Sequence, residues 1–341
     1  MLSRRLSRLF PGFIFLLPAF LIAGLPAQAG TISQLVVFGD SLSDNGNAAI
    51  ALGGALPGNY APNAFTDGPA TTPATAGPYG LWIDQLASDL GVLDPQPFLE
   101  GGTNYAVASA LTGHNPAFIL PPSLSVVPYT SDQVALYLLG NPPTLSDLYT
   151  FWVGANDIDA GGNPITAADN IATNIKTLAA DGGRDFLWLN LPPLGDTPDG
   201  VLSGESAALN AASGAFNAEW AADIAALQGE GIDVDGVNVA QLFAQIAGDP
   251  SAFGFTDITD PAWCGPGGLS TCASNNPNHF LYWDGEHPTT AADAQIAGLA
   301  FADVTATPEP NSLSLSFIGF CAVLFARARM RRRSLQSAIC S

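Results

Sequence analysis

The sequence predicts an α/β protein: a three-layer sandwich in which helices cover both faces of a central parallel sheet of about five strands. Two observations predict this class. Short β-forming runs recur along the chain, and each is nearly continuous in apolar residues, as expected of strands buried on both faces. Helical patterns separate these runs, and strands that alternate with helices form βαβ units, which build parallel sheets.

The predicted strands, in chain order, are residues 34–39, 104–108, 149–154, 186–191 and 234–239. The predicted helices are residues 80–90, 131–139, 167–180, 203–228 and 289–302. Thr289 and Thr290, just after Pro288, are good caps for the last helix. Three irregular stretches, residues 52–77, 112–130 and 249–278, interrupt the alternation. We expect these stretches to be loops that shape a site or, in part, disordered surface.

Both ends of the chain have the composition of targeting segments. Residues 1–29 combine three arginines, an apolar run and a small-residue cleavage pattern, Ala27-Gln28-Ala29, which predicts a secretory signal peptide. The alternative is an uncleaved membrane anchor. Residues 306–333 contain Pro308-Glu309-Pro310, about fifteen mostly apolar residues and five arginines, which predicts a short membrane helix with its basic end inside. Residues 30–305 are then left as one domain.

The predicted domain is strongly acidic. It holds all the acids of the chain except Glu309, and its only Lys and Arg residues are Lys176 and Arg184, so 29 acids and two bases give a formal charge of −27. Nucleic acid is excluded as a partner because phosphate binding needs a basic surface. An acidic surface also keeps exported proteins soluble, and it opposes binding to anionic membranes unless cations screen the charge.

Cys264 and Cys272 are the two cysteines of this domain, in a loop rich in Gly, Pro and Ser. In an exported protein we expect them to form one disulfide, although the spacing alone leaves free thiols open. No histidine cluster accompanies them, so no zinc site is predicted, and we predict no metal site elsewhere.

Polar side chains follow several predicted strands, and open parallel sheets bind ligands beyond the carboxyl ends of their strands. Ser41 follows the first strand, Asn156 follows the third, and Asp284 and His287 precede the last helix. A serine hydroxyl needs a base to become a nucleophile, and His287 suits that role. Asp284 is positioned to orient the imidazole, and we favour it over Glu286 because adjacent side chains diverge.

Attack on an ester also requires hydrogen-bond donors for the developing oxyanion. The predicted donors are the backbone N–H of Ser41, the side-chain amide of Asn156, and a backbone N–H of Ala108 or Ser109, of which we favour Ser109. Asp157 would repel an oxyanion, so we expect its carboxylate to point elsewhere, into structural hydrogen bonds.

Three segments resemble the conserved blocks of the GDSL, or SGNH, hydrolases, a family of secreted esterases and lipases. The segments are Phe38-Gly39-Asp40-Ser41-Leu42-Ser43-Asp44-Asn45-Gly46-Asn47, Gly154-Ala155-Asn156-Asp157 and Asp284-Gly285-Glu286-His287-Pro288. The resemblance implies a flavodoxin-like sheet, no cofactor, and an ester substrate: a lipid, a short acyl ester or an acetylated polysaccharide. One block departs, because Ala108 and Ser109 stand where the family usually has glycines. If the backbone needs a positive φ there, either residue is strained.

The C-terminal segment resembles the PEP-CTERM sorting signal of Gram-negative bacteria. That resemblance implies processing by an exosortase-type enzyme, transient anchoring in the inner membrane, and export to the periplasm, cell surface or extracellular matrix. We expect a monomeric serine esterase or lipase that acts through an acyl-enzyme. The alternative is a catalytically impaired matrix or carbohydrate-binding protein on the same fold, since fold does not guarantee activity.

Overall fold

The computed structural model describes residues 32–54, 56, 60–61, 63–67, 80–119, 126–263 and 276–306. The predicted signal peptide, the tail beyond residue 306, and Cys264 and Cys272 therefore lie outside the described residues. Residues 30–306 belong to one compact unit. Among the helices described here, none has the length and apolar character needed to cross a membrane.

A four-stranded parallel sheet forms the centre of the domain. Its strands are β1 (Gln34–Gly39), β4 (Asp147–Trp152), β5 (Asp185–Leu189) and β6 (Asp233–Val237), in the spatial order β1-β4-β5-β6. All residues of β4 are buried, and four of its six residues are Leu, Tyr, Phe or Trp, as expected of a strand covered on both faces.

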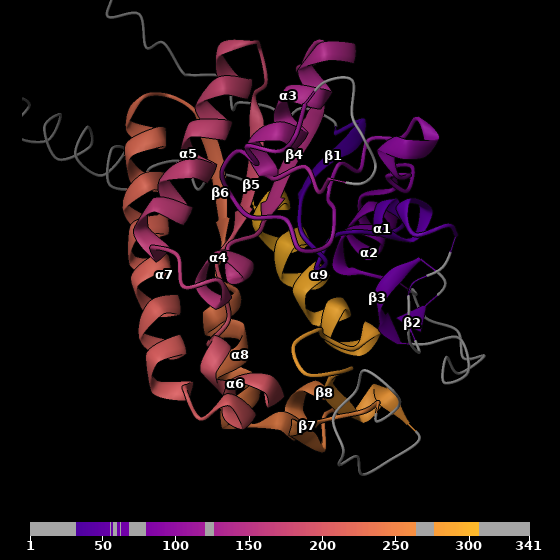
Figure 1. The fold of residues 1–341 in the computed structure, drawn as a ribbon, viewed down its shortest axis with the longest axis vertical. Helices are drawn as coiled ribbons and strands as arrows, with labels where there is room; N and C mark the ends of the chain where they lie inside the picture. Colours follow the sequence, from indigo (N-terminus) through magenta and orange to yellow (C-terminus); the bar gives the residue numbers. More distant parts are fainter. Residues whose placement is uncertain are drawn as a thin grey trace, which may run out of the picture. The chain divides into compact units, whose positions relative to one another are not determined.

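Helices cover both faces of this sheet, so the predicted α/β class with a central parallel sheet is confirmed (Figure 1). One face packs against α3 (Thr130–Gly140), α5 (Pro164–Ala180) and α7 (Ser206–Gly229). The other face packs against α2 (Trp82–Leu90), α8 (Val239–Gly248) and α9 (Thr290–Thr305). Because successive strand residues point to opposite faces, Val36 contacts the first layer and Val37 the second.

The prediction of a strand at residues 104–108 is wrong. Asn104 forms only isolated bridges, to Val37 and to Pro97. The segment still runs beside β1, because Tyr105 N–H donates to the Val37 carbonyl at 2.8 Å. The Val107 N–H still donates to the Gly39 carbonyl at 3.2 Å, but the ladder does not propagate because the Gly39 N–H, which the next rung needs, donates to the Gln133 side chain instead. Counting this segment as the second element, the spatial order is 2-1-3-4-5, as in flavodoxin-like folds.

Smaller elements surround the carboxyl ends of the strands. Short helices follow two strands: α1 (Asn47–Ala51) after β1 and α4 (Ala155–Asp159) after β4. A third, α6 (Pro198–Ser203), precedes α7. Two pairs of short strands also occur: β2 (Tyr60–Ala61) with β3 (Ala64–Asp67), and β7 (Asp257–Pro261) with β8 (Phe280–Tyr282). The β2–β3 hairpin lies within the stretch predicted to be irregular, so that prediction is wrong for these residues.

Candidate active site

Ser41 lies on a turn that follows β1 directly. The strand cannot continue past Gly39, because the Gln133 side chain occupies both of its backbone groups, accepting from its N–H at 3.0 Å and donating to its carbonyl at 2.8 Å. A side chain at this position would approach the Trp152 carbonyl to 2.7 Å, so only glycine fits. Asp40 then accepts the Leu42 N–H at 3.0 Å, which closes the turn around Ser41.

The Asp44 carboxylate stabilises this turn through hydrogen bonds to backbone N–H groups. One of its carboxylate oxygens accepts the N–H groups of Gly46 and Asn47, and the other accepts those of Ala48 and Ala108. Burial raises the pKa of Asp44 to about 6, although these N–H donors oppose that rise. The same carboxylate therefore holds the start of α1 and the segment beside β1 in one arrangement.

His287 comes from the turn between β8 and α9. Asp284 organises this turn, because its Oδ1 atom accepts the backbone N–H groups of Glu286 at 2.9 Å and His287 at 2.8 Å. Its other oxygen lies 2.8 Å from Nδ1 of His287. Thr289, as predicted, caps α9 by accepting the Ala292 N–H. The Thr289 cap and the hydrogen bonds of Asp284 together fix the orientation of the imidazole ring.

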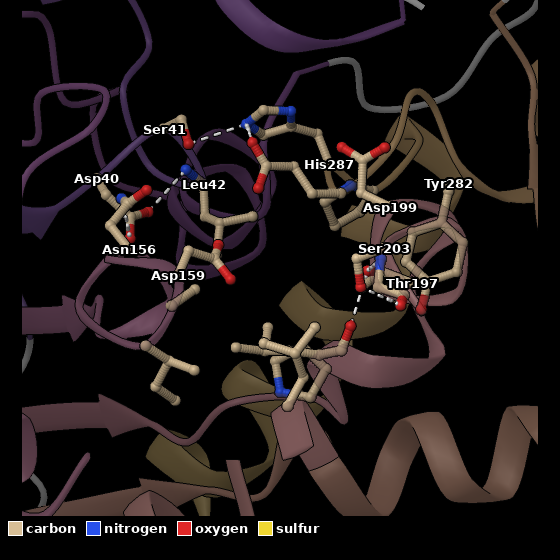
Figure 2. Close-up of a pocket in the computed structure, with 18 of the residues that line it drawn as sticks. Asp40, Ser41, Leu42, Asn156, Asp159, Thr197, Asp199, Ser203, Tyr282 and His287 are labelled. Atoms are coloured by element: carbon tan, nitrogen blue, oxygen red, sulfur yellow. Dashed lines mark hydrogen bonds and ion pairs between the residues drawn. The ribbon is translucent and has the colours of Figure 1, made fainter. Parts of the chain in front are cut away.

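The structure brings the hydroxyl, the imidazole and the carboxylate together. Ser41 Oγ lies 2.9 Å from His287 Nε2, although 246 positions separate the two residues in the chain. Figure 2 shows this contact, with Asp40 and Asn156 on the other side of Ser41. Glu286 was the rival to Asp284, and its carboxylate lies 3.8 Å from Nε2 and is half exposed. The favoured residue, Asp284, makes the shorter contact, to the opposite ring nitrogen.

The charges around the imidazole are strongly coupled. Burial alone would lower the pKa of His287, but Asp284, Glu286 and Asp40 together raise it to about 9. Burial works in the opposite direction on Asp284, where the charge and hydrogen bonds of His287 prevail and lower the carboxyl pKa to about 2. Asp40 is fully buried beside this pair, and burial raises its pKa to about 7.

The three predicted oxyanion donors differ in their surroundings. The Ser41 N–H forms no hydrogen bond to any of the described residues. The Asn156 amide donates to the Ala110 carbonyl at 3.1 Å and to Asp40 Oδ2 at 3.3 Å, so it is oriented but already occupied. The Ala108 N–H is bound to Asp44 and is unavailable, which leaves Ser109 as the third candidate.

Ser109 is the single non-glycine residue of the described segments with a positive φ, at 64°. It is exposed, and it is not among the residues that line the cavity beside Ser41. Asp157 points away from the cavity, as expected, because its carboxylate accepts the N–H and the hydroxyl of Thr112.

A cavity of about 420 Å³ opens beside Ser41 and His287. Its wall is mixed in character. Apolar side chains, including Ile158, Leu194 and Leu209, form one part, and five carboxyl groups form another: Asp40, Asp159, Asp199, Glu205 and Glu286. Among the described residues that line it there is no lysine or arginine, so the imidazole of His287 is the group there that can carry a positive charge.

Sequence reasoning missed two aromatic residues that contact the His287–Asp284 pair. The Tyr60 hydroxyl donates to Asp284 Oδ2 at 2.7 Å, and the Phe65 ring stacks on the imidazole with centroids 5.2 Å apart. Both come from the β2–β3 hairpin. The sequence signal for them was weak, because Gly, Pro and Thr surround them and the alternation that would mark a strand is too short.

The family model for GDSL-like lipases and acylhydrolases matches residues 35–299 of the chain. The chain belongs to this family. The matched range includes Ser41 near its start and His287 near its end, the two residues that meet at 2.9 Å.

Among proteins with related sequences, a phosphatidylcholine-sterol acyltransferase of Aeromonas hydrophila is 27% identical over 68% of this chain and 66% of its own length. An uncharacterised protein of Pseudomonas putida is 26% identical over 85% of this chain and 52% of its own. The chain thus spans about half to two thirds of these relatives. A third relative, from Arabidopsis thaliana, is 24% identical over 82% of this chain and 73% of its own and is named an inactive GDSL esterase/lipase-like protein.

The chain is also similar to solved structures at low sequence identity. An aryl esterase of Mycobacterium smegmatis is 15% identical with a TM-score of 0.44, and the match covers 81% of this chain and all of that one. A carbohydrate acetylesterase of Sinorhizobium meliloti is 14% identical with the same TM-score, over 80% of this chain and 99% of that one.

Proposed function

We propose that this GDSL-family protein is an exported serine hydrolase that cleaves carboxylic esters through an acyl-enzyme on Ser41. The observation that carries the proposal is the unbroken series of short contacts from Ser41 Oγ through the imidazole to Asp284, at the edge of a cavity. An alcohol, an imidazole and a buried carboxylate in this order are what base-assisted attack by a serine requires.

The reaction proceeds in two halves. Ser41 Oγ attacks the ester carbonyl while its proton passes to His287 Nε2, and the resulting imidazolium returns that proton to the departing alkoxide. The acyl group is then bonded to Ser41. Water attacks it, His287 accepts a proton from the water, and the carboxylic acid leaves as Ser41 recovers its proton. Asp284 keeps the Nδ1–H tautomer in place and stabilises the imidazolium.

The oxyanion forms beside the Ser41 N–H and the Asn156 amide. Asn156 can turn toward it because the bond to Asp40, at 3.3 Å, is the longer of its two. Ser109 is retained as the third donor, since the alternative N–H of Ala108 is bound to Asp44. No step needs a metal or an organic cofactor.

The cavity supports an ester that carries no negative charge near the bond to be cleaved, because five carboxyl groups line it and none of its described lining residues is a lysine or arginine. Lipids, short acyl esters and acetylated polysaccharides all meet this condition if they are neutral at that point. The domain limits 30–305, the signal peptide at 1–29, the exosortase-processed tail at 306–333 and the Cys264–Cys272 disulfide belong to the same proposal. They place the enzyme outside the cytoplasm of a Gram-negative bacterium.

The proposal is tested with p-nitrophenyl esters of increasing acyl length and with acetylated glycans. Ser41→Ala should abolish turnover while leaving the melting temperature near that of the parent. The matched control is Ser146→Ala, which removes a half-buried serine hydroxyl next to the start of β4, at the opposite end of the strands. Full turnover by Ser41→Ala would remove Ser41 from the mechanism. A folded parent with no turnover of any ester would favour the impaired alternative.

A further inference from the structure

The β2–β3 hairpin is fastened to the turn that carries His287. The Thr66 hydroxyl donates to the Pro288 carbonyl at 3.0 Å, and Asp67 accepts the Thr290 N–H at 3.2 Å. Thr66 and Asp67 are both buried. These bonds hold the hairpin against the residues that immediately follow the catalytic imidazole of the proposed mechanism.

Aromatic packing then sets the position of Tyr60 within the hairpin. Its ring meets Phe65 edge-on with centroids 5.1 Å apart, and it meets Trp263 edge-on at 5.2 Å. Phe65 in turn stacks on His287 with an interplanar angle of 25°. Such contacts favour one ring orientation, so the phenol has a defined direction.

The hydroxyl of Tyr60 completes the hydrogen bonding of Asp284. Oδ1 of that carboxylate accepts two backbone N–H groups, and Oδ2 accepts both the imidazole Nδ1–H and the phenol. A carboxylate has about four lone-pair positions, and here each has a donor. Asp284 is only 4% exposed, so water cannot readily replace a missing donor.

We propose that Tyr60 is a positioning residue of this active site. Its hydroxyl fixes the orientation of the Asp284 carboxylate toward His287, and it weakens the attraction of that carboxylate for the protonated imidazole. The inference rests on the proposed function. Without the phenol, Oδ2 would have one donor fewer, and its negative charge would act more strongly on the imidazolium. Tyr60 would therefore keep the pKa of His287 lower than Asp284 alone would set it.

Tyr60 itself stays protonated, because burial and the charge of Asp284 both raise its pKa. Other charged groups also face the pair and act on the imidazole. These are Asp40 on the turn after β1, Asp199 on α6 and Glu286 beside His287. A Tyr60 variant leaves all three in place, so any change in the titration of His287 is attributable to the lost hydroxyl.

The test is Tyr60→Phe, which removes one oxygen and retains the ring that Phe65 and Trp263 contact. The matched control is Tyr137→Phe, because Tyr137 is a buried tyrosine whose hydroxyl also donates to a carboxylate, Asp147, outside the site. We expect Tyr60→Phe to lower kcat by roughly tenfold, from the loss of one hydrogen bond to a charged group, with KM little changed. The acid limb of kcat/KM should move to higher pH. Tyr137→Phe should leave both kcat and the acid limb of kcat/KM unchanged.

A second measurement does not depend on turnover. The chain has three histidines, so ¹⁵N-histidine labelling of the full protein gives few signals, and His287→Gln assigns the one of interest. In Tyr60→Phe the pKa of His287 should rise relative to the parent and to Tyr137→Phe. A lower kcat with an unchanged pKa would mean a merely structural role and would overturn the inference, as would unchanged values of both. A parent that titrates as described but hydrolyses no ester would defeat the proposed function alone.

Discussion

Replacement of Ser109 by glycine tests the backbone strain that the positive φ of this residue indicates. Ser109 has a φ of 64°, a region that costs a residue with a Cβ about 1–2 kcal/mol. Glycine removes that cost but loses about 0.5–1 kcal/mol more conformational freedom on folding. The hydroxyl contributes no compensating bond to the described residues. The difference predicts that Ser109→Gly stabilises the protein by about 0.5–1 kcal/mol, which raises the melting temperature by about 2 °C.

The assay is thermal unfolding of parent, Ser109→Gly and Ser109→Ala under identical conditions. The alanine variant is the matched control, because it loses the same hydroxyl but keeps the Cβ and therefore the strain. Its melting temperature should stay near that of the parent. Both variants retain the backbone N–H, so both should keep kcat within about twofold if that N–H is the donor. A lower melting temperature for Ser109→Gly than for Ser109→Ala would refute the assignment of strain to this position.

Three further predictions concern the site and its charges. Asn156→Ala should lower kcat by about 10²–10³-fold without a matching rise in KM, measured by steady-state kinetics, because it removes an oxyanion donor; equal kinetics would exclude Asn156 from that role. The acid limb of kcat/KM should lie above the usual histidine value of 6.5, displaced toward 9, because only neutral His287 accepts the serine proton; a limb at or below 6.5 would contradict the coupling to Asp284, Glu286 and Asp40. The free energy of unfolding should fall as pH rises, whereas kcat/KM should increase. Asp40 and Asp44 have folded-state pKa values near 7 and 6, against 3.8 in the unfolded chain. The stability that they contribute at low pH is therefore lost as pH rises through their folded-state values. Denaturant unfolding at pH 5 and pH 8 checks this, and greater stability at pH 8 would contradict it.

The main framework of the fold could be predicted from the sequence because its strands are buried on both faces. Continuous apolar runs placed β1, β4, β5 and β6 within a few residues. The run at residues 104–108 is also rich in apolar residues, and the ladder stops there because the Gly39 N–H donates to the distant Gln133 side chain, a contact that a composition pattern does not record. Helix α8 was missed because it begins at Val239, where an apolar strand pattern passes directly into a helix.

The meeting of Ser41 with His287 could be expected because each lies beside a recognisable block at the carboxyl edge of the sheet. The contributions of Tyr60 and Phe65 could not. Their roles depend on a short hairpin whose two strands hold only two and four residues, and on packing against a turn more than 200 positions later. Likewise the loss of Ala108 as a donor follows from its bond to Asp44, a long-range contact without a local sequence signal.

Labelling with a fluorophosphonate, followed by peptide mapping, tests the central claim most directly, because the reagent bonds only to a serine whose hydroxyl is activated. The account predicts one adduct per chain, on Ser41, formed in the parent and lost in His287→Gln although Ser41 is still present. Labelling of Ser41 at the same rate in His287→Gln, or an adduct on a different serine in the parent, would contradict the claim that the imidazole activates this hydroxyl.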